Sequence, residues 1–458
     1  MRLPLLARTL AIAAVAVAIL VPIAMIDGKI AERRARADGV VSEFASQTSG
    51  PQLVVGPLLA LTCEETYVAE RQVMRSGKAE TISETRTRAC PTAFVAPRSL
   101  EANASVPVEN LHRGIYSIRM YRADLTLQGE LEWPRPPRPA GQAVRAWKDA
   151  YVVTFLQDPR GIKAVSSAIS NELLAATGEP GLAAFSIRES LGPYAARGPG
   201  AVVPFLYRID LVGTSSFAIA PVGDRNHIHI GSDWPHPSFA ASWSPDRRAI
   251  GPRGFDADWR MTSVATGGSG RWNELAQGGK LASANAAGLS LFDPVNVYTL
   301  SYRATQYAFL FVLFTFAALA LAEVLSGVRL HPVQYALVGS ALAVFFLLLI
   351  ALSEHVPFEW AYSGAAAACV ALLTFYLRHP LGSPRRTALF FAIFVALYGS
   401  LYLVLQSEDD ALLLGSLMVF ALLAAIMVAT RKLDWAAIGA RLARGTRPTP
   451  PPAQRTAG

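Results

Sequence analysis

The side chains most suited to chemistry lie in one short stretch near the middle of the chain. On a β-strand His227 and His229 project to the same face, and Asp233 and His236 follow within reach of a turn. Such imidazole and carboxylate groups could hold zinc or copper, as a periplasmic metal-dependent hydrolase requires. The same run also fits an exposed strand that ends in a turn, with Trp234 covering the core. Because no spacing in the sequence fixes a ligand geometry, we favour this structural interpretation and expect neither a metal nor a cofactor.

A second group of ionisable residues lies at the ends of long apolar stretches. Glu354 and His355 follow one stretch, and Glu408 and Asp409 follow another, so these four could meet on one side of a membrane. Glu323 lies near the opposite, cytoplasmic end of its stretch. Such a cluster could relay protons, bind a cation or dock an exported domain. The alternative, that these residues cap helices at the headgroup level, is favoured because no stretch has an ionisable residue at its midpoint.

Sequence signatures of common enzymes are absent from this chain. It contains no phosphate-binding Gly-x4-Gly-Lys loop, no Gly-x-Ser-x-Gly elbow, no His-Glu-x2-His and no Cys-x2-Cys. We therefore predict no catalytic residues and expect a protein that is not an enzyme.

Apolar stretches long enough to cross a bilayer dominate the last third of the sequence. About 20 apolar residues span a hydrocarbon core as a helix. Five stretches qualify: Thr305–Leu325, Val333–Leu352, Phe358–Leu377, Thr387–Gln406 and Ala411–Thr430. A sixth, Leu3–Ile26, is longer than the apolar region of a signal peptide and lacks a good cleavage site, so we interpret it as an uncleaved anchor. The sequence thus predicts six transmembrane helices.

The charges of the connecting loops predict the orientation of these helices. Basic residues follow the first, third and fifth stretches of the bundle, whereas acidic residues follow the second and fourth. Short loops rich in Arg and Lys stay in the cytoplasm. A basic cluster after the anchor opposes this orientation, but large domains translocate largely regardless of charge. We predict cytoplasmic termini, an anchor at residues 1–26, a periplasmic domain at 27–304, a bundle at 305–432 and a basic, Pro-rich cytoplasmic tail at 433–458.

The domain between anchor and bundle is predicted to be rich in β-strand. Asp27–Gln47 has helical spacing and continues the anchor as a stalk, and a short helix is expected at Ala168–Thr177. Alternation or β-branched residues predict strands at Gln52–Thr62, Ile115–Leu127, Asp149–Leu156, Pro204–Leu211, Ser215–Pro221 and Asn226–Ile230. From these strands we predict a sandwich-like domain. Cys63 and Cys90 both fall in it, and in an oxidising compartment they form either a disulfide, which we favour, or two separate thiols.

Composition supports a membrane protein. The 458 residues are 52% hydrophobic and 17% charged, which is too apolar for an ordinary soluble enzyme. Much of the net charge of +8 lies beside the apolar stretches and in the tail, where it fits attraction to anionic lipid better than nucleic-acid binding. We expect the lipid bilayer and an unknown envelope protein or cell-wall partner as its contacts, and no nucleic acid.

Long motifs in both halves of the chain resemble the CreD family of inner-membrane proteins. In the bundle these are Tyr302-Arg-Ala-Thr-Gln-Tyr-Ala-Phe-Leu-Phe, Glu323, His331-Pro-Val-Gln-Tyr-Ala-Leu-Val-Gly339, Leu352-Ser-Glu-His355, the run from Tyr398 to Asp409, and Thr430-Arg-Lys-Leu-Asp-Trp435. In the exported domain they are Ser232-Asp-Trp-Pro-His-Pro-Ser-Phe239 and Gly254-Phe-Asp-Ala-Asp-Trp259. The chain departs from the family pattern at Thr48-Ser-Gly-Pro-Gln52 and over Gly267–Ala287. The first departure raises the question whether that strand entry packs as it does in relatives.

The resemblance implies a Gram-negative inner-membrane protein linked to envelope integrity and stress. Family members are controlled by the Cre two-component system and affect tolerance to colicins and β-lactams. No reaction is implied. We therefore favour a non-enzymatic protein whose periplasmic domain contacts an envelope partner. The alternatives are an ion-coupled transporter or signal-relay bundle using the outer-face cluster, and the metal-dependent hydrolase.

Overall fold

The computed structural model divides the chain into two compact units. One unit combines residues 1–37 with 295–458, and the other, here called the β-domain, is residues 38–294. The structure describes residues 5–75, 78–136, 143–169, 173–175, 185–239, 241–268, 272, 285–291, 297–326, 330–407 and 411–431.

A single helix, α1 (Leu5–Gln47), holds both the predicted anchor and the predicted stalk. Its apolar first part is followed from Asp27 by charged residues, while helical spacing continues without a break. The helix ends where Ser49, Gly50 and Pro51 follow, because Gly and Pro do not continue a helix. The amide of Thr48 still donates to the carbonyl of Phe44, which completes the last turn.

The β-domain contains two mixed sheets, each eight-stranded within the described residues. The first sheet has the order β13 (Pro237–Ser238), β16 (Ala287–Leu291), β11 (Ser216–Ile219), β1 (Gln52–Arg75), β6 (Val144–Leu156), β9 (Phe185–Ser190) and β8 (Leu173–Ala175), and β2 (Lys78–Val95) also pairs with β1. The second sheet has the order β14 (Arg247–Gly251), β15 (Gly254–Thr262), β12 (Arg225–Ser232), β3 (Ser99–Ser105), β5 (Tyr116–Glu132), β10 (Val202–Thr214) and β7 (Ile162–Ser167), with β4 (Val108–Arg113) beside β5. A short helix, α2 (Ser263–Thr266), follows β15.

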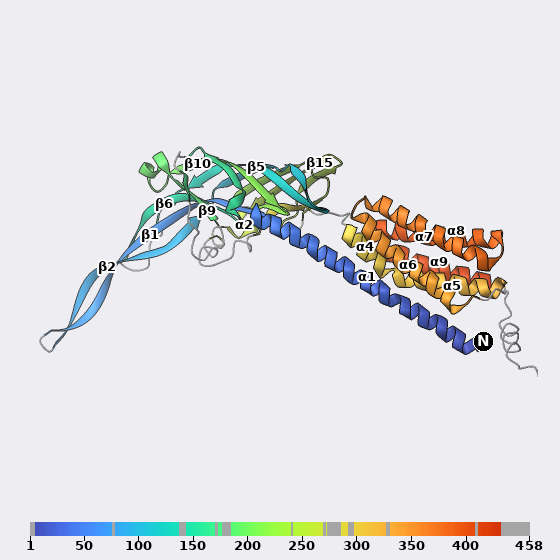
Figure 1. Ribbon diagram of the computed structural model, residues 1–458. Helices are drawn as coiled ribbons and strands as arrows, with labels where there is room; N and C mark the ends of the chain where they lie inside the picture. Colours follow the sequence, from blue (N-terminus) through green and yellow to red (C-terminus); the bar gives the residue numbers. More distant parts are fainter. Residues whose placement is uncertain are drawn as a thin grey trace, which may run out of the picture. The chain divides into compact units, whose positions relative to one another are not determined.

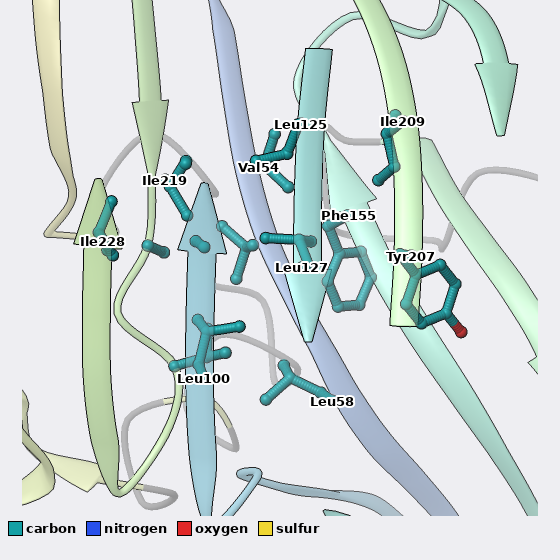
Figure 2. Packing of buried hydrophobic residues seen from close by; sticks show 14 of the residues in the cluster. Val54, Leu58, Leu100, Leu125, Leu127, Phe155, Tyr207, Ile209, Ile219 and Ile228 are labelled. Atoms are coloured by element: carbon teal, nitrogen blue, oxygen red, sulfur yellow. The ribbon is translucent and has the colours of Figure 1, made fainter. Parts of the chain in front are cut away.

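Apolar side chains from both sheets form one core. Figure 2 shows Val54 and Phe155 of the first sheet beside Leu127 and Tyr207 of the second, and all four are buried. The sandwich follows from alternation: in β15 every second residue is buried, which places one face of the strand in the core. Full burial of each large apolar side chain stabilises the fold by about 1.5–3 kcal/mol.

The hairpin of β1 and β2 is longer than the sheet that it joins. The two strands pair from Leu59 opposite Val95 to Arg75 opposite Lys78. The neighbouring strand β6 pairs with β1 only as far as Thr66. Beyond it, residues 67–75 and 78–86 continue as a two-stranded ribbon. This ribbon, together with residues 87–89 of β2, is here called the arm, and it extends past the other strands of the β-domain (Figure 1).

A disulfide joins the two strands just before the arm begins. Cys63 and Cys90 are paired directly across the ladder, with 5.2 Å between their Cα atoms. A register shift lies between Leu61 and Cys63, and Pro91 follows Cys90 on the outer strand. Such a bulge with a proline is typical of the edge of a sheet.

The helix predicted at residues 168–177 is wrong. Within that range the structure describes 168–169 as a bend and Leu173–Ala175 as strand β8, which pairs antiparallel with β9 from Leu173 opposite Glu189. Pairing with an existing strand supplies backbone hydrogen bonds that outweigh the weak helical preference of the segment.

Six helices follow the β-domain in the described part of the chain. They are α4 (Val297–Gln306), α5 (Ala308–Ser326), α6 (Pro332–Ser353), α7 (Phe358–Leu381), α8 (Pro384–Gln406) and α9 (Ala411–Thr430). They pack around aromatic side chains, with ring centroids of Phe345 and Tyr398 4.7 Å apart and those of Phe311 and Tyr398 5.2 Å apart. α1 also joins this unit, because Ile19 lies so close to Gly339 that a Cβ there would meet it at 2.7 Å.

The count of six membrane spans requires correction. Among the described residues, four helices are long and apolar enough to cross a membrane, namely α1, α6, α7 and α8, and a fifth candidate is the bent pair α4–α5. The stretch predicted as one span from Thr305 is broken beside Tyr307, where the two helices meet at 45°. Polar residues before the break end the apolar run. The part of the chain that the structure describes therefore has four to five candidate spans in place of the six predicted.

Candidate functional sites

His227 and His229 lie side by side on the outer face of the second sheet. The alternate residues of β12, Ile228 and Ile230, are fully buried, so the imidazoles point away from the core. Both contact Asp258 of the neighbouring strand β15: its Oδ1 lies 3.2 Å from His227 Nε2 and 3.2 Å from His229 Nδ1. One carboxylate thus holds two imidazoles.

These two contacts lower the pKa of Asp258. Partial burial alone would raise the pKa of its carboxyl, but hydrogen bonds from His227 and His229 outweigh burial, and the pKa lies below its usual value. The second acidic neighbour, Asp256, is 3.7 Å from His229 Nε2 and largely exposed. Within the part of the chain that the structure describes, no three His, Cys, Asp or Glu side chains form a group that could hold a metal ion.

The other three residues of the predicted loop have structural contacts. Asp233 Oδ1 accepts a hydrogen bond of 2.8 Å from the amide of Val108. The Trp234 indole donates to the carbonyl of His236, whose own ring lies edge-on to it, with centroids 5.9 Å apart. The Arg119 guanidinium lies over the same indole, 4.5 Å from the ring centroid. This loop therefore fastens the start of β4 and the face of β5 rather than completing a histidine site.

A hollow with both polar and apolar lining lies beside His227. Its volume is about 780 Å³, and charged side chains of both signs line it together with His227: Glu101, Glu130, Arg225 and Arg260. The strand register explains this grouping, because His227 is paired with Glu101 on one side and with Arg260 on the other. Side chains opposite one another in a sheet share a face. The hollow can therefore accept a polar group that carries either charge.

The predicted membrane-boundary cluster is only partly described. Glu354 caps α6 and lies 3.6 Å from the Arg33 guanidinium of α1, an ion pair longer than a hydrogen bond. The Glu354 side chain is 9% exposed, whereas the Arg33 side chain is 43% exposed, so only the carboxylate of this pair is shielded from solvent. The His355 ring Nδ1 lies 3.1 Å from the carbonyl of Ala351 and occupies a helix end. Glu408 and Asp409 lie outside the described residues.

Glu323 belongs to α5 and lies beside the first turn of α6, whereas Glu354 follows the last turn of α6. Its carboxylate accepts hydrogen bonds from the amide of Leu330 and from the Tyr335 hydroxyl, the latter at 3.3 Å. Tyr335 is in the first turn of α6, whereas Glu354 follows its last residue, about 30 Å along the helix at 1.5 Å per residue. The structure therefore does not bring these two carboxylates together.

A buried polar network that sequence reasoning missed holds the junction of α1 and β1. Gln52 Nε2 donates to Ser49 Oγ at 2.7 Å and to the carbonyl of Asp158 at 2.8 Å. The Asp158 carboxylate accepts from the amide of Gly50 at 3.0 Å and from the Arg160 guanidinium. The Arg160 hydrogen bond, and then the Gly50 amide, hold the pKa of Asp158 below its usual value against the opposing effect of burial. The divergent entry to β1 is thus firmly packed.

A second missed group is the buried carboxyl of Glu189. The residue is fully buried on β9, and its Oε2 accepts hydrogen bonds from the Tyr207 hydroxyl and, at 2.8 Å, from Ser167 Oγ. The Glu189 side chain therefore links β9 of the first sheet to β10 and β7 of the second sheet. No sequence signal marked it, since a polar residue in an alternating strand is normally assigned to the exposed face.

Comparison with known proteins covers nearly the whole chain. The family model described as inner membrane protein CreD matches residues 4–436. The chain belongs to the CreD family. The inner membrane protein CreD of Escherichia coli (strain K12) is 31% identical over 437 residues, which cover 91% of this chain and 90% of the relative. The match includes α1, the β-domain and the bundle, so this is an inner-membrane protein with several membrane-crossing helices.

Proposed function

We propose that this protein supports cell-envelope integrity and stress tolerance without catalysing a reaction. In this proposal its β-domain lies in the periplasm and binds a polar envelope partner in the hollow beside His227. The hollow carries the proposal, because it is a concave surface with charged groups of both signs. Its volume of about 780 Å³ falls within the range of about 300–1,000 Å³ common for ligand sites.

Two observations support the periplasmic location of the β-domain. The Cys63–Cys90 disulfide persists in oxidising compartments such as the periplasm and is rare in the bacterial cytoplasm. The basic residues Arg378, Arg385 and Arg386 border the connection between α7 and α8, whereas Glu354 and Glu359 border the connection between α6 and α7. By the positive-inside rule, the first connection is cytoplasmic and the second faces the periplasm.

The lining of the hollow favours binding over chemistry. Glu101 accepts a hydrogen bond of 2.6 Å from Gln128, and the Arg260 backbone amide is bound by Asp246 at 2.6 Å. These contacts fix the strands while the Arg225 and Arg260 side chains remain exposed. Exposed guanidinium groups recognise carboxylate or phosphate groups through paired hydrogen bonds. A partner with such groups would fit between them.

Charge reversal in the hollow tests this proposal. The double variant Arg225→Glu with Arg260→Glu is expected to reach wild-type abundance in the membrane and yet fail to restore growth of a deletion strain under envelope stress. The matched control is Arg208→Glu, an exposed arginine of the same sheet that does not line the hollow. Full restoration of growth by the double variant would overturn the proposal.

An ion-coupled bundle is the second candidate, and the contacts of Glu354 do not favour it. This carboxylate is paired with Arg33, and α1 is further tied to the bundle by a hydrogen bond of 2.7 Å from the Thr305 hydroxyl to Asp27. Both contacts fit helix docking. We expect Glu354→Gln to restore growth in the same assay with reduced thermal stability, whereas ion flux that depends on Glu354 in liposomes would favour the transporter.

A further inference from the structure

The outer strand of the arm presents a free edge. β2 is paired with β1 along one side, and among the residues that the structure describes no other strand pairs with it. Every residue from Thr81 to Ala89 is exposed. An edge of this kind offers a row of unpaired backbone donors and acceptors to another strand. Pro91, beyond the disulfide, has no backbone N–H and marks the end of the usable edge.

The two faces of this edge differ in chemistry. Thr81, Ser83, Thr85 and Thr87 alternate along one face and carry only hydroxyl groups. The opposite face carries Ile82, Glu84, Arg86 and Arg88. Glu84 and Arg86 contact one another at 2.9 Å, and their side chains are 57% and 49% exposed, so both lie on the surface within reach of an adjacent strand.

We propose that this edge pairs antiparallel with the same edge of a second copy of the chain, about a two-fold axis through Thr85. Thr85 then lies opposite Thr85 of the second copy, and Ser83 lies opposite Thr87. On the other face Glu84 lies opposite Arg86, and the two-fold axis produces this pair twice. Ile82 lies opposite Arg88, so no like charges are opposed. The inference does not depend on the partner proposed for the hollow.

Charge selects this register over its neighbours. If the register shifts by two residues in one direction, Glu84 lies opposite Glu84 of the second copy. If it shifts by two residues in the other direction, Arg86 lies opposite Arg86 of the second copy. Like charges directly opposite one another destabilise a strand pair, and opposite charges stabilise it. Shifts by an odd number of residues would break the match between outward-pointing backbone groups of the two strands. Isologous pairing of this kind closes as a dimer and does not propagate.

Cysteine crosslinking of the full-length protein in membranes tests the register. Opposed residues of antiparallel strands have Cα atoms about 4.5–5.5 Å apart, within the range that a disulfide bridges. In a Cys369→Ser background, mild oxidation should link Thr85→Cys to itself at least about ten-fold more than Thr81→Cys, which faces residue 89 instead. A mixture of Thr81→Cys and Ala89→Cys chains should crosslink. Peptide mapping confirms that Cys63 remains bonded to Cys90 in each variant.

A charge swap provides the second, independent measurement. Glu84→Arg opposes two arginines and should abolish the crosslink at position 85, and Arg86→Glu should do the same. Combining the two substitutions restores opposite charges and should restore the crosslink. Light scattering on detergent-purified protein without added cysteines should show a dimer for wild type and the double variant, and a monomer for Glu84→Arg. Equal crosslinking at positions 81 and 85, or no dimer in wild type, would overturn the pairing.

Discussion

The two halves of the β1–β2 hairpin share one ladder but differ in side-chain burial, in side-chain chemistry and in the strands beside them. In the first half, Leu53–Leu61 is an almost continuous apolar run, and its residues apart from Gly56 and Pro57 are among the buried core. In the arm, the outer strand from Thr81 to Ala89 alternates hydroxyl and mainly charged side chains, and all are exposed. The first half is flanked by β6 and β11, whereas the arm is two strands alone.

This difference shows which forces hold each half. A two-stranded ribbon is marginally stable in water, because backbone hydrogen bonds alone contribute little net free energy. The first half is stabilised by side-chain burial, which the arm lacks. The Cys63–Cys90 disulfide lies at the boundary between them. It fixes the ladder where packing ends, and the arm is left as a surface for contact with other chains.

Truncation of one core residue should have the largest effect on stability. Leu59 is fully buried, and Leu59→Ala is expected to destabilise the β-domain by about 2–5 kcal/mol through lost burial and the cavity that remains. Val68→Ala in the arm, where the side chain is 49% exposed, should change stability by less than about 0.5 kcal/mol. Thermal unfolding of the purified chain, followed by circular dichroism, measures both. Similar shifts in melting temperature would contradict the division of the hairpin.

Removal of the disulfide should affect the arm more than the core. The bond closes a separation of 27 residues, and its loss in the double variant Cys63→Ser, Cys90→Ser should cost about 3 kcal/mol. We expect trypsin to cleave the arm at Arg71, Arg86 and Arg88 much faster, while the fragments that contain the core persist. Cys369→Ser is the control, since that thiol is buried in α7. Unchanged cleavage would show that the ladder holds the arm without the bond.

The network at the entry to β1 should contribute a smaller, pH-dependent term. Asp158→Asn removes the charged acceptor of Arg160 and is expected to cost about 1–3 kcal/mol at neutral pH. Because the folded-state pKa of Asp158 is lowered, its carboxylate stabilises the fold above the unfolded pKa of about 3.9, and this contribution is lost as the pH falls through the folded pKa. The melting temperatures of variant and wild type should therefore converge in acid. A constant difference at all pH values would contradict this role.

The smallest effect on stability is expected at the histidine pair. His227 and His229 side chains are 39% and 36% exposed, and replacing both by Ala should change stability by less than about 0.5 kcal/mol. Asp258 would lose the hydrogen bonds that lower its pKa, so its pKa should rise in the double variant, as NMR titration of its carboxyl would show. Zinc bound in stoichiometric amount to wild type but not to this variant would instead support a metal site.

Local pattern predicted the strands that have one buried face. All six predicted strand segments fall largely within strands of the structure, for example Asn226–Ile230 within β12. The arm was missed because neither of its faces is buried, so the alternation that marks a half-buried strand is not apolar. Glu189 was missed for the opposite reason: its polar side chain occupies a core-facing position, which only the pairing of Tyr207 and Ser167 beside it explains.

The sequence predicted the positions of the long apolar helices better than it predicted whether each helix is continuous. The sequence marked where α6, α7 and α8 lie, because apolar composition over about 20 residues is a strong signal. It did not show the 45° bend beside Tyr307, because a run of apolar residues does not reveal where a helix changes direction. For the predicted membrane-boundary cluster, the sequence likewise showed only that its residues follow the ends of apolar stretches, and not which side chains they contact. Pairing of Glu354 with Arg33 joins residues more than 300 positions apart and leaves no local pattern.

Photocrosslinking in living cells tests most directly whether the β-domain acts by contact. A photoreactive amino acid at Thr262, an exposed position in the lining of the hollow, would be compared with one at Arg208, on the same sheet outside it. We expect a discrete adduct from position 262 that disappears with Arg225→Glu and Arg260→Glu, and none from position 208. Absence of an adduct at 262, or one that is unchanged by the charge reversal, would contradict the proposed binding surface.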